Sequence, residues 1–393
     1  MVSRPLRVLS IAHAAVSREA GRLRYAPFGG RTDLDVHLVV PRRWHQFGRA
    51  IDADPPDDPG IRVHVLPTWL PKAGPMGWYL HIYPGLRGLI RTLRPDVVHL
   101  WEEPWSFVAL QASLLRGPAG MVLEVDQNIL KRLPPPFEAI RRFTLARTAH
   151  VLARSPDATA VVRAGGYAGA VTPIGYGVDT RTFRPRTESG PSDVLRLGYV
   201  GRLVVEKGLD DVLDAMARSR VPTRLAIMGE GPHAPHLRRR IAELGLERSV
   251  TFAPWAAPAE VARFFHACDA VVLATRTTGA VREQFGRVII EAQACGVPVI
   301  GSTCGAIPSV VGPGGWIVPE SDPEAMARLL ERIAADPGER SARGRAGLRN
   351  VAERFTYEAV ADALAQAWLA AASAVSPSNE RLTPGAFCAG NQD

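Results

Sequence analysis

Two glutamates with seven residues between them stand out in the stretch EQFGRVIIEAQACG, which runs from Glu283 to Gly296. The apolar residues inside it predict a helix that begins at Gly286 or Arg287 and stops at Gly296, ahead of an apolar strand. A helix start carries unpaired N–H groups and the positive end of the helix dipole, so it favours phosphate. The residues that would offer these N–H groups are Phe285, Gly286, Arg287 and Val288.

The positions of the two carboxylates indicate what else the ligand carries. Glu283 lies just before the predicted helix, and Glu291 lies about one turn inside it among apolar neighbours. Carboxylates accept hydrogen bonds, and the vicinal hydroxyls of ribose and of sugars can donate them. A phosphate held between two such groups predicts a nucleotide sugar. The alternative is that Glu283 is a favourable helix-end charge and Glu291 a solvated helix residue.

Two cations follow another predicted strand, in the sequence GRLVVEKG. Arg202 and Lys207 precede a helix whose N-terminus disfavours cations, so their placement indicates an anion that both side chains contact. A surface pairing with Glu206 is the alternative. Small residues after a further strand, in GEGP from Gly229, would let a ligand approach the backbone closely, and a plain loop is the alternative.

Short apolar runs alternate with helical stretches, which predicts parallel sheets covered by helices on both faces. The expected strands are LRVLSIA, VHLVV, DVVHLW and MVLEV in the first half, and RLGYVG, RLAIMG, VTFAPW, AVVLAT and PVIGS in the second. A chain of 393 residues exceeds the usual size of one core, so two α/β domains are expected. A GxGxxG directly after the first strand is absent, which argues against NAD binding.

The expected division is an N-terminal Rossmann-like domain at 1–175, a hinge rich in Gly, Pro and Ser at 176–193, and a C-terminal Rossmann-like domain at 194–356. A long helix is expected at 357–372, and the polar tail 373–393 is expected to be disordered. The N-terminal RPLRVLSIAHAA imitates a short signal peptide, but the first strand of an α/β domain has the same appearance, and we favour the strand.

The net charge of +8 is uneven, because residues 1–175 hold 22 basic and 14 acidic residues whereas residues 176–393 hold 25 of each. This excess predicts either a first domain that approaches an anionic partner or a solvated basic face. No recognised nucleic-acid-binding module is present, so nucleic acid is not an expected partner. The cysteines show no CxxC spacing, which indicates neither a disulfide framework nor a zinc site and suits a reducing cytoplasm.

Together these motifs resemble a GT-B glycosyltransferase of the retaining GT4 type over about residues 5–372. The resemblance is carried by YVGRLVVEKG, MGEGP, CDAVVLA and EQFGRVIIEAQACGVPVIGSTCG, with IGYGVDTRTFRP at the hinge. It implies two Rossmann-like domains facing each other across a cleft, with the helix at 357–372 crossing back to the N-terminal domain. It also implies retaining, metal-independent transfer of a hexose-like sugar from a UDP- or GDP-type donor to a hydroxyl, with no cofactor.

The resemblance implies roles for individual residues of the donor domain. Arg202 and Lys207 would neutralise the diphosphate together with the amides at the helix start. Glu291 would hold the ribose hydroxyls, and Glu283 would contact the transferred sugar. The remaining donor contacts would come from Gly201, Gly231 and the Pro254–Trp255 backbone, the last two flanking the base.

The N-terminal domain departs from the family pattern. Many relatives carry a histidine after the strand that corresponds to MVLEV, whereas this chain has Asp126, Gln127 and Asn128 there. Asp126 is the catalytic candidate in that region. The sequence AHAAVS replaces the glycine-rich loop after the first strand, and His13 would contact the donor from it. A structural histidine is the alternative.

Two carboxylates follow the strand DVVHLW and are the candidates for acceptor binding. Glu102 or Glu103 would orient an acceptor hydroxyl, while the flanking Trp101 and Trp105 offer faces that suit sugar rings or lipid. A capped helix start is the alternative.

These observations predict a cytoplasmic glycosyltransferase, peripheral on the inner membrane face, that acts on a lipid-linked or cell-surface polysaccharide or glycolipid precursor. The basic N-terminal domain would meet an anionic membrane, and Trp69, Trp78 and Tyr79 would form a membrane-touching loop or, alternatively, a simple surface helix. The other functions left open are transfer to a soluble small molecule, non-catalytic nucleotide binding, and nucleotide-sugar epimerisation.

Overall fold

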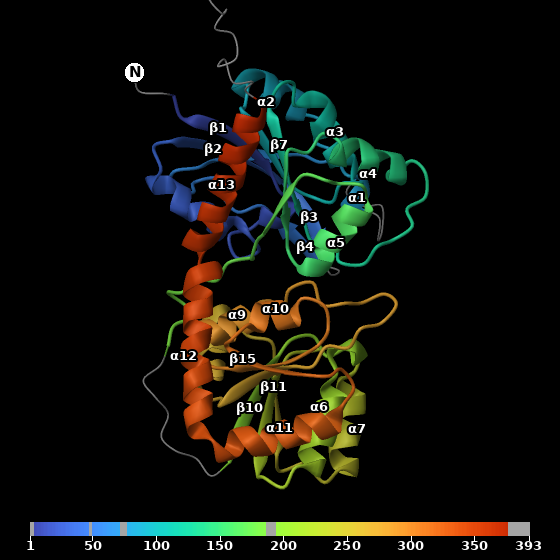
Figure 1. Cartoon of the computed structure of the whole chain (residues 1–393), viewed down its shortest axis with the longest axis vertical. Coiled ribbons are helices and arrows are strands. Elements are labelled where there is room, and N and C mark those ends of the chain that lie inside the picture. Colours follow the sequence, from blue (N-terminus) through green and yellow to red (C-terminus); the bar gives the residue numbers. More distant parts are fainter. Residues whose placement is uncertain (1–3, 47–48, 71–76, 186–193, 376–393) are drawn as a thin grey trace, which may run out of the picture.

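The structure, a computed structural model, describes residues 4–46, 49–70, 77–185 and 194–375. The described chain forms two lobes, each built on one parallel sheet, that lie one above the other in Figure 1. Every run that the sequence predicted as a strand forms one. The predicted α/β class with two parallel sheets is therefore confirmed.

The first lobe is built on a seven-stranded sheet. In spatial order its strands are β5 (Arg62–Leu66), β2 (Leu34–Pro41), β1 (Leu6–Ile11), β6 (Val97–Trp101), β7 (Gly120–Val125), β8 (His150–Ala153) and β9 (Ala170–Pro173). Its helices are η1 (His13–Ala15), η2 (Arg22–Gly30), α1 (Gly77–Leu80), α2 (Leu86–Leu93), α3 (Phe107–Leu115), α4 (Phe137–Leu145) and α5 (Pro156–Ala164). A separate antiparallel hairpin joins β3 (Arg43–Gln46) to β4 (Arg49–Asp52).

The second lobe is built on a six-stranded sheet. In spatial order its strands are β12 (Val250–Ala253), β11 (Thr223–Met228), β10 (Leu195–Val200), β13 (Ala270–Leu273), β14 (Val299–Ser302) and β15 (Gly315–Val318). Its helices are η4 (Val205–Lys207), α6 (Leu209–Arg218), α7 (Ala234–Glu243), α8 (Pro258–His266), α9 (Arg287–Ala294), α10 (Ile307–Val311), α11 (Pro323–Ala335) and α12 (Pro337–Arg354).

Each sheet is buried on both faces. Successive residues of a strand point to opposite faces of the sheet and pack into two different apolar clusters. In β1, Val8 packs in one apolar cluster and Leu9 in the other, and neither side chain is exposed. Parallel strands covered on both sides are expected to be apolar throughout, as these are. The carboxyl ends of the strands carry the loops in which ligands of open α/β sheets bind.

The last described helix, α13 (Tyr357–Val375), leaves the second lobe and packs along the first (Figure 1). Its Trp368 is fully buried, with its ring centroid 4.9 Å from that of Phe28. Gly120 of β7 allows the close approach, because a Cβ there would lie 2.5 Å from the carbonyl oxygen of Ala371. The predicted return of this helix to the N-terminal domain is therefore observed.

The two segments that cross between the lobes lie side by side, since the Val178 amide donates to the Phe355 carbonyl at 2.8 Å. Much of the predicted hinge (186–193) and most of the predicted tail (376–393) lie outside the described residues. Residues 373–375, which were assigned to the tail, belong to α13.

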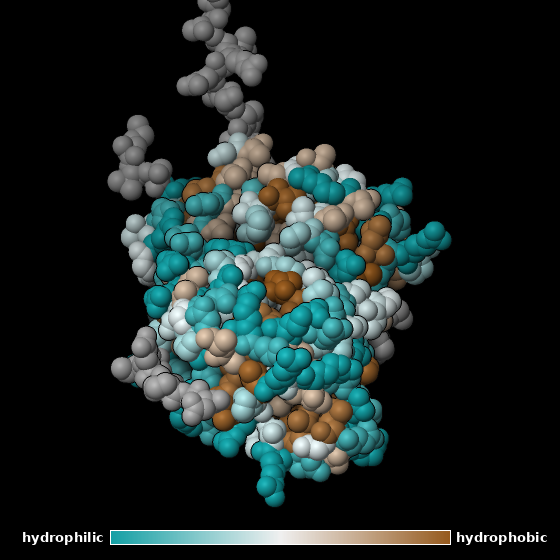
Figure 2. All heavy atoms as spheres, turned by 60° about the horizontal axis from the view of Figure 1, so that its bottom comes forward, coloured by the Kyte–Doolittle hydropathy of each residue, from teal (hydrophilic) through white to brown (hydrophobic). Residues whose placement is uncertain are grey.

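The face shown in Figure 2 has no single large apolar patch. Its hydrophobic residues lie in separate groups among hydrophilic ones. None of the helices in the described ranges is long and apolar enough to cross a membrane. The predicted membrane-touching loop includes residues 71–76, which lie outside the described residues. Trp69 and Trp78 beside it are exposed.

Candidate functional site

The N-terminus of α9 lacks a capping side chain among the described residues, which is what the predicted phosphate site would require. Gly286 is the N-cap with φ of +82°, and no side chain caps the helix. Glycine is required because this left-handed backbone strains other residues and because a Cβ would lie 2.9 Å from Ile289 and Leu273 side-chain atoms. Within the described chain, no hydrogen-bond acceptor is found for these four amides: Phe285, Gly286, Arg287 and Val288.

Lys207 and Glu283 meet directly in front of this helix, although they are far apart in the sequence. The Lys207 Nζ lies 2.5 Å from Glu283 Oε2, and the Thr275 hydroxyl donates to the same oxygen at 3.0 Å. Both charged side chains are largely buried, with 19% and 14% of their surface exposed. Lys207 therefore pairs with Glu283, not with the neighbouring Glu206 as the alternative interpretation supposed.

Loops after β10 and β11 lock together beside this pair. The Leu203 amide donates to the Glu230 carbonyl at 2.8 Å, and the His233 amide donates to the Leu203 carbonyl at 3.0 Å. Gly231 has to be glycine here, because a Cβ would lie 2.2 Å from the Leu203 carbonyl oxygen. These contacts fix the loop that begins at Gly201. Arg202 lies in this loop and is exposed.

Two further residues predicted to contact the donor are Trp255 and Glu291. Trp255 follows β12 and is 58% exposed, so its indole is accessible. Glu291 lies inside α9 with 18% of its side chain exposed, and its Oε1 is 3.9 Å from the Arg287 Nε. Burial raises the pKa of the Glu291 carboxyl, and the Arg287 charge acts in the opposite direction.

A residue of the first lobe reaches across to the Glu283 loop. The Asn128 side-chain amide donates to the carbonyl oxygens of Arg282 at 3.1 Å and Glu283 at 3.0 Å. The Arg282 guanidinium lies 3.1 Å from Asp157 of the first lobe. The region that lacks the family histidine is thus in contact with the Glu283 loop of the second lobe, but through an amide and backbone carbonyls.

Asp126, the catalytic candidate of that region, is occupied by structural partners. Its Oδ1 accepts from the Arg154 guanidinium at 2.7 Å and from the Tyr176 hydroxyl at 3.1 Å, and its Oδ2 accepts from the Trp101 indole at 3.0 Å. Arg154 also pairs with the fully buried Glu124. With these partners, the Asp126 carboxylate has a structural role in the loop after β7.

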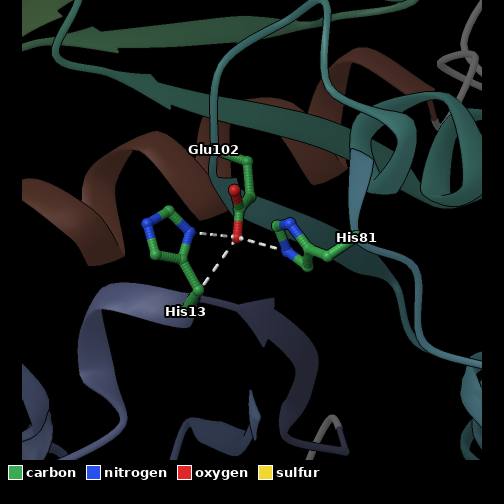
Figure 3. Close-up of side chains that lie close together, drawn as sticks. All are labelled: His13, His81 and Glu102. Atoms are coloured by element: carbon green, nitrogen blue, oxygen red, sulfur yellow. Dashed lines mark hydrogen bonds and ion pairs between the residues drawn. The ribbon is translucent and has the colours of Figure 1, made fainter. Parts of the chain in front are cut away.

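His13 and Glu102, for which the sequence suggested separate roles, lie together in the first lobe. The His13 Nδ1 is 2.7 Å from Glu102 Oε1, and His81 Nε2 is 3.6 Å from the same oxygen (Figure 3). Burial tends to raise the pKa of Glu102, but the two histidines lower it to about 2. Sequence analysis missed His81, which lies in no recognisable motif.

Glu103 has a different environment from its neighbour. Its Oε1 accepts from the amides of Asp126 and Gln127 at 3.0 and 2.8 Å, while its Oε2 is buried without a hydrogen-bond partner in the described chain. Burial and the Asp126 charge raise the pKa of Glu103 to about 8, so this carboxyl is largely protonated at neutral pH.

Two expectations for this region are wrong. The N-cap of α3 is Ser106, whose hydroxyl accepts from the Ala109 amide, so neither glutamate caps that helix. Trp101 and Trp105 are 2% and 3% exposed, so their faces are covered by protein and cannot stack on a sugar ring or lipid.

Comparison with known proteins agrees with this geometry. The family model for group 1 glycosyl transferases matches residues 182–349, and the model for glycosyltransferase family 4 matches residues 30–182. The Anabaena protein HepE, solved in complex with UDP, superposes with a TM-score of 0.68 at 17% identity, covering 92% of this chain and 98% of that one. That likeness supports the GT-B fold.

Curated relatives match over about half of their length. The D-inositol 3-phosphate glycosyltransferase of Segniliparus rotundus is 35% identical over 212 residues, which is 50% of this chain and 46% of that protein. A GDP-mannose-dependent alpha-(1-6)-phosphatidylinositol monomannoside mannosyltransferase of Mycolicibacterium smegmatis is 37% identical over 187 residues, or 44% and 49% of the two chains. With both lobes matched by family models, the chain belongs to the group 1, family 4 glycosyltransferases of GT-B fold.

Proposed function

We propose that this protein transfers a sugar, with retention, from a nucleotide diphosphate sugar to a hydroxyl acceptor. The lobe at 194–356 would bind the donor, and the lobe at 1–175 would bind the acceptor. The observation that carries the proposal is that Glu283, which pairs with Lys207, closely precedes the α9 N-terminus, whose four amides have no acceptor in the described chain.

This arrangement suits the chemistry of a departing nucleoside diphosphate. When the bond to the sugar breaks, negative charge grows on the diphosphate, and a fixed cation and helix-end amides stabilise that charge most strongly in the transition state. Lys207 is held in place by Glu283, and Arg202 lies on the same loop. Glu283 would then contact the transferred sugar, and Glu291 the ribose.

We expect the diphosphate of the donor to bind without a metal ion, because the side-chain cations and the helix-end amides can neutralise its charge. Nucleotide binding should therefore persist in excess EDTA. The family resemblance fits a nucleotide of UDP or GDP type; the HepE complex supports UDP, whereas the GDP-mannose-dependent relative supports GDP.

For the acceptor we propose a hydroxyl of a phosphorylated cyclitol, either free or as the headgroup of a lipid. Both curated relatives described above are named for inositol-containing substrates, one soluble and one lipid-linked. The basic excess of residues 1–175 suits such an anionic acceptor. A lipid acceptor would require a peripheral location at a membrane, and a free one would not.

The first test is calorimetric binding of UDP, GDP, ADP and TDP to the purified protein and to Arg202→Ala. A charge-assisted phosphate contact should be worth about 1.5–3 kcal/mol, or roughly ten- to a hundredfold in affinity. Arg224→Ala is the matched control, because Arg224 is an exposed arginine near the amino end of β11, the sheet edge opposite the ligand-binding loops. If no diphosphate binds, or if both variants behave like wild type, the donor site is refuted.

The acceptor is tested next with the sugar nucleotides of whichever base binds. Product formation is compared for inositol phosphate in solution and for phosphatidylinositol in vesicles, and the anomeric configuration of the product is read by NMR. Turnover with vesicles alone supports the lipid acceptor, turnover with the free phosphate supports the soluble one, and inversion would refute retention.

A further inference from the structure

His13, His81 and Glu102 converge on one point although they come from three separate elements of the first lobe. His13 opens η1 just after β1, His81 follows α1, and Glu102 follows β6. Both imidazoles point at the same carboxylate oxygen (Figure 3), with distances of 2.7 and 3.6 Å to Glu102 Oε1. The ligand atoms of the three residues all lie within 4.8 Å of one another.

The burial of His81 is not compensated by a hydrogen bond to either ring nitrogen within the described chain, and its interaction with Glu102 is a longer one of 3.6 Å. Its side chain is 0% exposed, and neither ring nitrogen has a hydrogen-bond partner in the part of the chain that the structure describes. A buried polar group without a partner loses its hydration and gains nothing in return, at a typical cost of about 1–3 kcal/mol. The Nε2 atom is nevertheless aimed at the Glu102 oxygen, at a distance beyond hydrogen-bond length.

The surroundings hold these groups in place without competing for them. Trp44 packs against both histidines, with ring-centroid distances of 4.5 Å to His13 and 4.8 Å to His81. Trp44 is 2% exposed, so this side of the cluster is apolar. An apolar wall strengthens the attraction between a cation and its ligands because it excludes water. The side chain of His13 is 20% exposed, so solvent can reach the cluster there.

Two imidazoles and one carboxylate form a ligand set that zinc uses. Tetrahedral Zn²⁺ with bonds of about 2.0–2.2 Å separates its ligand atoms by roughly 3.3 Å. The two nitrogen-to-oxygen distances of 2.7 and 3.6 Å bracket that value, and the two nitrogens lie within 4.8 Å of each other, so side-chain adjustments would be needed to complete the geometry. We propose that His13 Nδ1, His81 Nε2 and Glu102 Oε1 bind one divalent cation, Zn²⁺, with an open position at the exposed side of His13.

This site stands apart from the donor chemistry proposed above, and either can fail without the other. It gives His81 Nε2 a partner and joins the loop after β1 to the loop after β6. It also assigns His13 and Glu102 to a metal, in place of the donor and acceptor contacts expected from the sequence. The three residues span about ninety positions with no metal-ligand spacing, which explains why the sequence indicated no metal here.

A second histidine–carboxylate group provides the matched control. His233 and His236 each bond a different oxygen of Asp210, at 2.7 and 2.8 Å, and the side chain of His236 is 47% exposed. These histidines already have partners in the protein. The double variant His233→Ala/His236→Ala removes this group, so metal that remains bound in that background must come from elsewhere.

The experiment uses the full chain, purified with a tag that contains no histidine and stripped with EDTA. Zn²⁺ is titrated against a chromogenic chelator in the His233→Ala/His236→Ala background, with Co²⁺ absorption as a report on coordination. We expect one Zn²⁺ per chain, a rise in the thermal midpoint on adding Zn²⁺, and a d–d spectrum typical of four or five ligands. His81→Gln should weaken Zn²⁺ binding by at least about a hundredfold, above the effect of losing an outer-shell partner.

Two results would overturn the site. The first is no stoichiometric Zn²⁺ in the control background, and the second is equal Zn²⁺ affinity in His81→Gln. Far-UV circular dichroism and a cooperative urea transition serve as the check on folding of each variant, so this check does not depend on the proposed donor site. Should His81→Gln fail to fold, His13→Gln and Glu102→Gln carry the same expectation, and an unchanged thermal midpoint of the control background with Zn²⁺ or EDTA is sufficient to reject the proposal.

Discussion

Removing the positive charge of Lys207 and removing the negative charge of Glu283 should have opposite effects on nucleoside diphosphate binding. In the ligand-free protein Lys207 and Glu283 satisfy each other at 2.5 Å, and Thr275 supplies the only other hydrogen bond to the Glu283 carboxylate within the described chain. A diphosphate bound at the α9 N-terminus would add negative charge next to Glu283 and would compete with it for Lys207. The cation should therefore favour the ligand, and the carboxylate should oppose it.

The sizes follow from the contacts. Lys207→Met removes one charge-assisted bond to phosphate, so diphosphate affinity should fall by about ten- to a hundredfold, or roughly 1.5–3 kcal/mol. Glu283→Gln removes the competing charge, so affinity should stay the same or rise by up to about tenfold. Turnover should still fall by at least about tenfold in Glu283→Gln, because its contact with the transferred sugar is lost.

Calorimetry with the preferred nucleoside diphosphate and initial rates with its sugar conjugate provide the two readouts. The control pair is Arg328 and Glu324 of α11, whose side chains lie 2.8 Å apart on the surface of the same lobe. Arg328→Met and Glu324→Gln should change neither readout. If Lys207→Met and Glu283→Gln weaken diphosphate binding to the same extent, the pair is a structural ion pair and the reasoning is refuted.

Three other perturbations test the fold around the site. Trp368→Ala should lower the free energy of unfolding by about 3–5 kcal/mol in urea titrations, because the side chain is fully buried between α13 and the first lobe; a loss below about 1 kcal/mol would contradict that packing. Asn128→Ala should reduce turnover while leaving diphosphate affinity within about twofold, since it removes two hydrogen bonds between the lobes and none at the α9 amides; a large loss of affinity would mean that Asn128 acts on the donor site itself. Burial lowers the pKa of His37, His64, His99 and His150, so the unfolded chain takes up protons at a pH where these histidines stay neutral in the folded protein. Their contribution to stability is complete above about pH 6.5 and is lost as the pH falls below it, whereas Glu103, whose pKa is raised to about 8, contributes in the opposite direction over the same range. Because four histidines outnumber this one carboxyl, the urea midpoint should drop between about pH 7 and 5.5, and a flat profile would contradict this.

The features that local sequence determines are the ones that sequence analysis predicted. Gly286 and Gly296 bound α9 as expected, because each takes a positive φ that glycine tolerates best. Apolar runs became buried parallel strands, since a strand covered on both faces has to be apolar throughout. The strands β5, β8, β9 and β15 and the β3–β4 hairpin were missed, because runs of four or five residues carry little periodicity, although β12, β13 and β14 of similar length were predicted.

Pairings across the chain could not be predicted in the same way. Lys207 and Glu283 were each recognised as charges near a ligand, but their contact depends on how β10 and α9 are placed by the sheet. The buried ion network of Arg24, Glu124 and Arg154 gave no signal at all, because its members lie on separate elements and only the fold makes them neighbours. His81 was missed for the same reason.

The contacts of Asp126 indicate how the two lobes communicate. Arg154, Trp101 and the Tyr176 hydroxyl all bond its carboxylate, and the Tyr176 ring lies 5.2 Å from Phe285 in an edge-on contact. Phe285 is 3% exposed and directly precedes the N-cap of α9, so its position sets where the helix-end amides point. The Asp126 side chain is 24% exposed, and its three hydrogen-bond partners hold this partly buried carboxylate in one position. Asp126 therefore fits a positioning role: it bonds Tyr176, Tyr176 contacts Phe285, and these contacts align the N-terminal end of α9 with the first lobe.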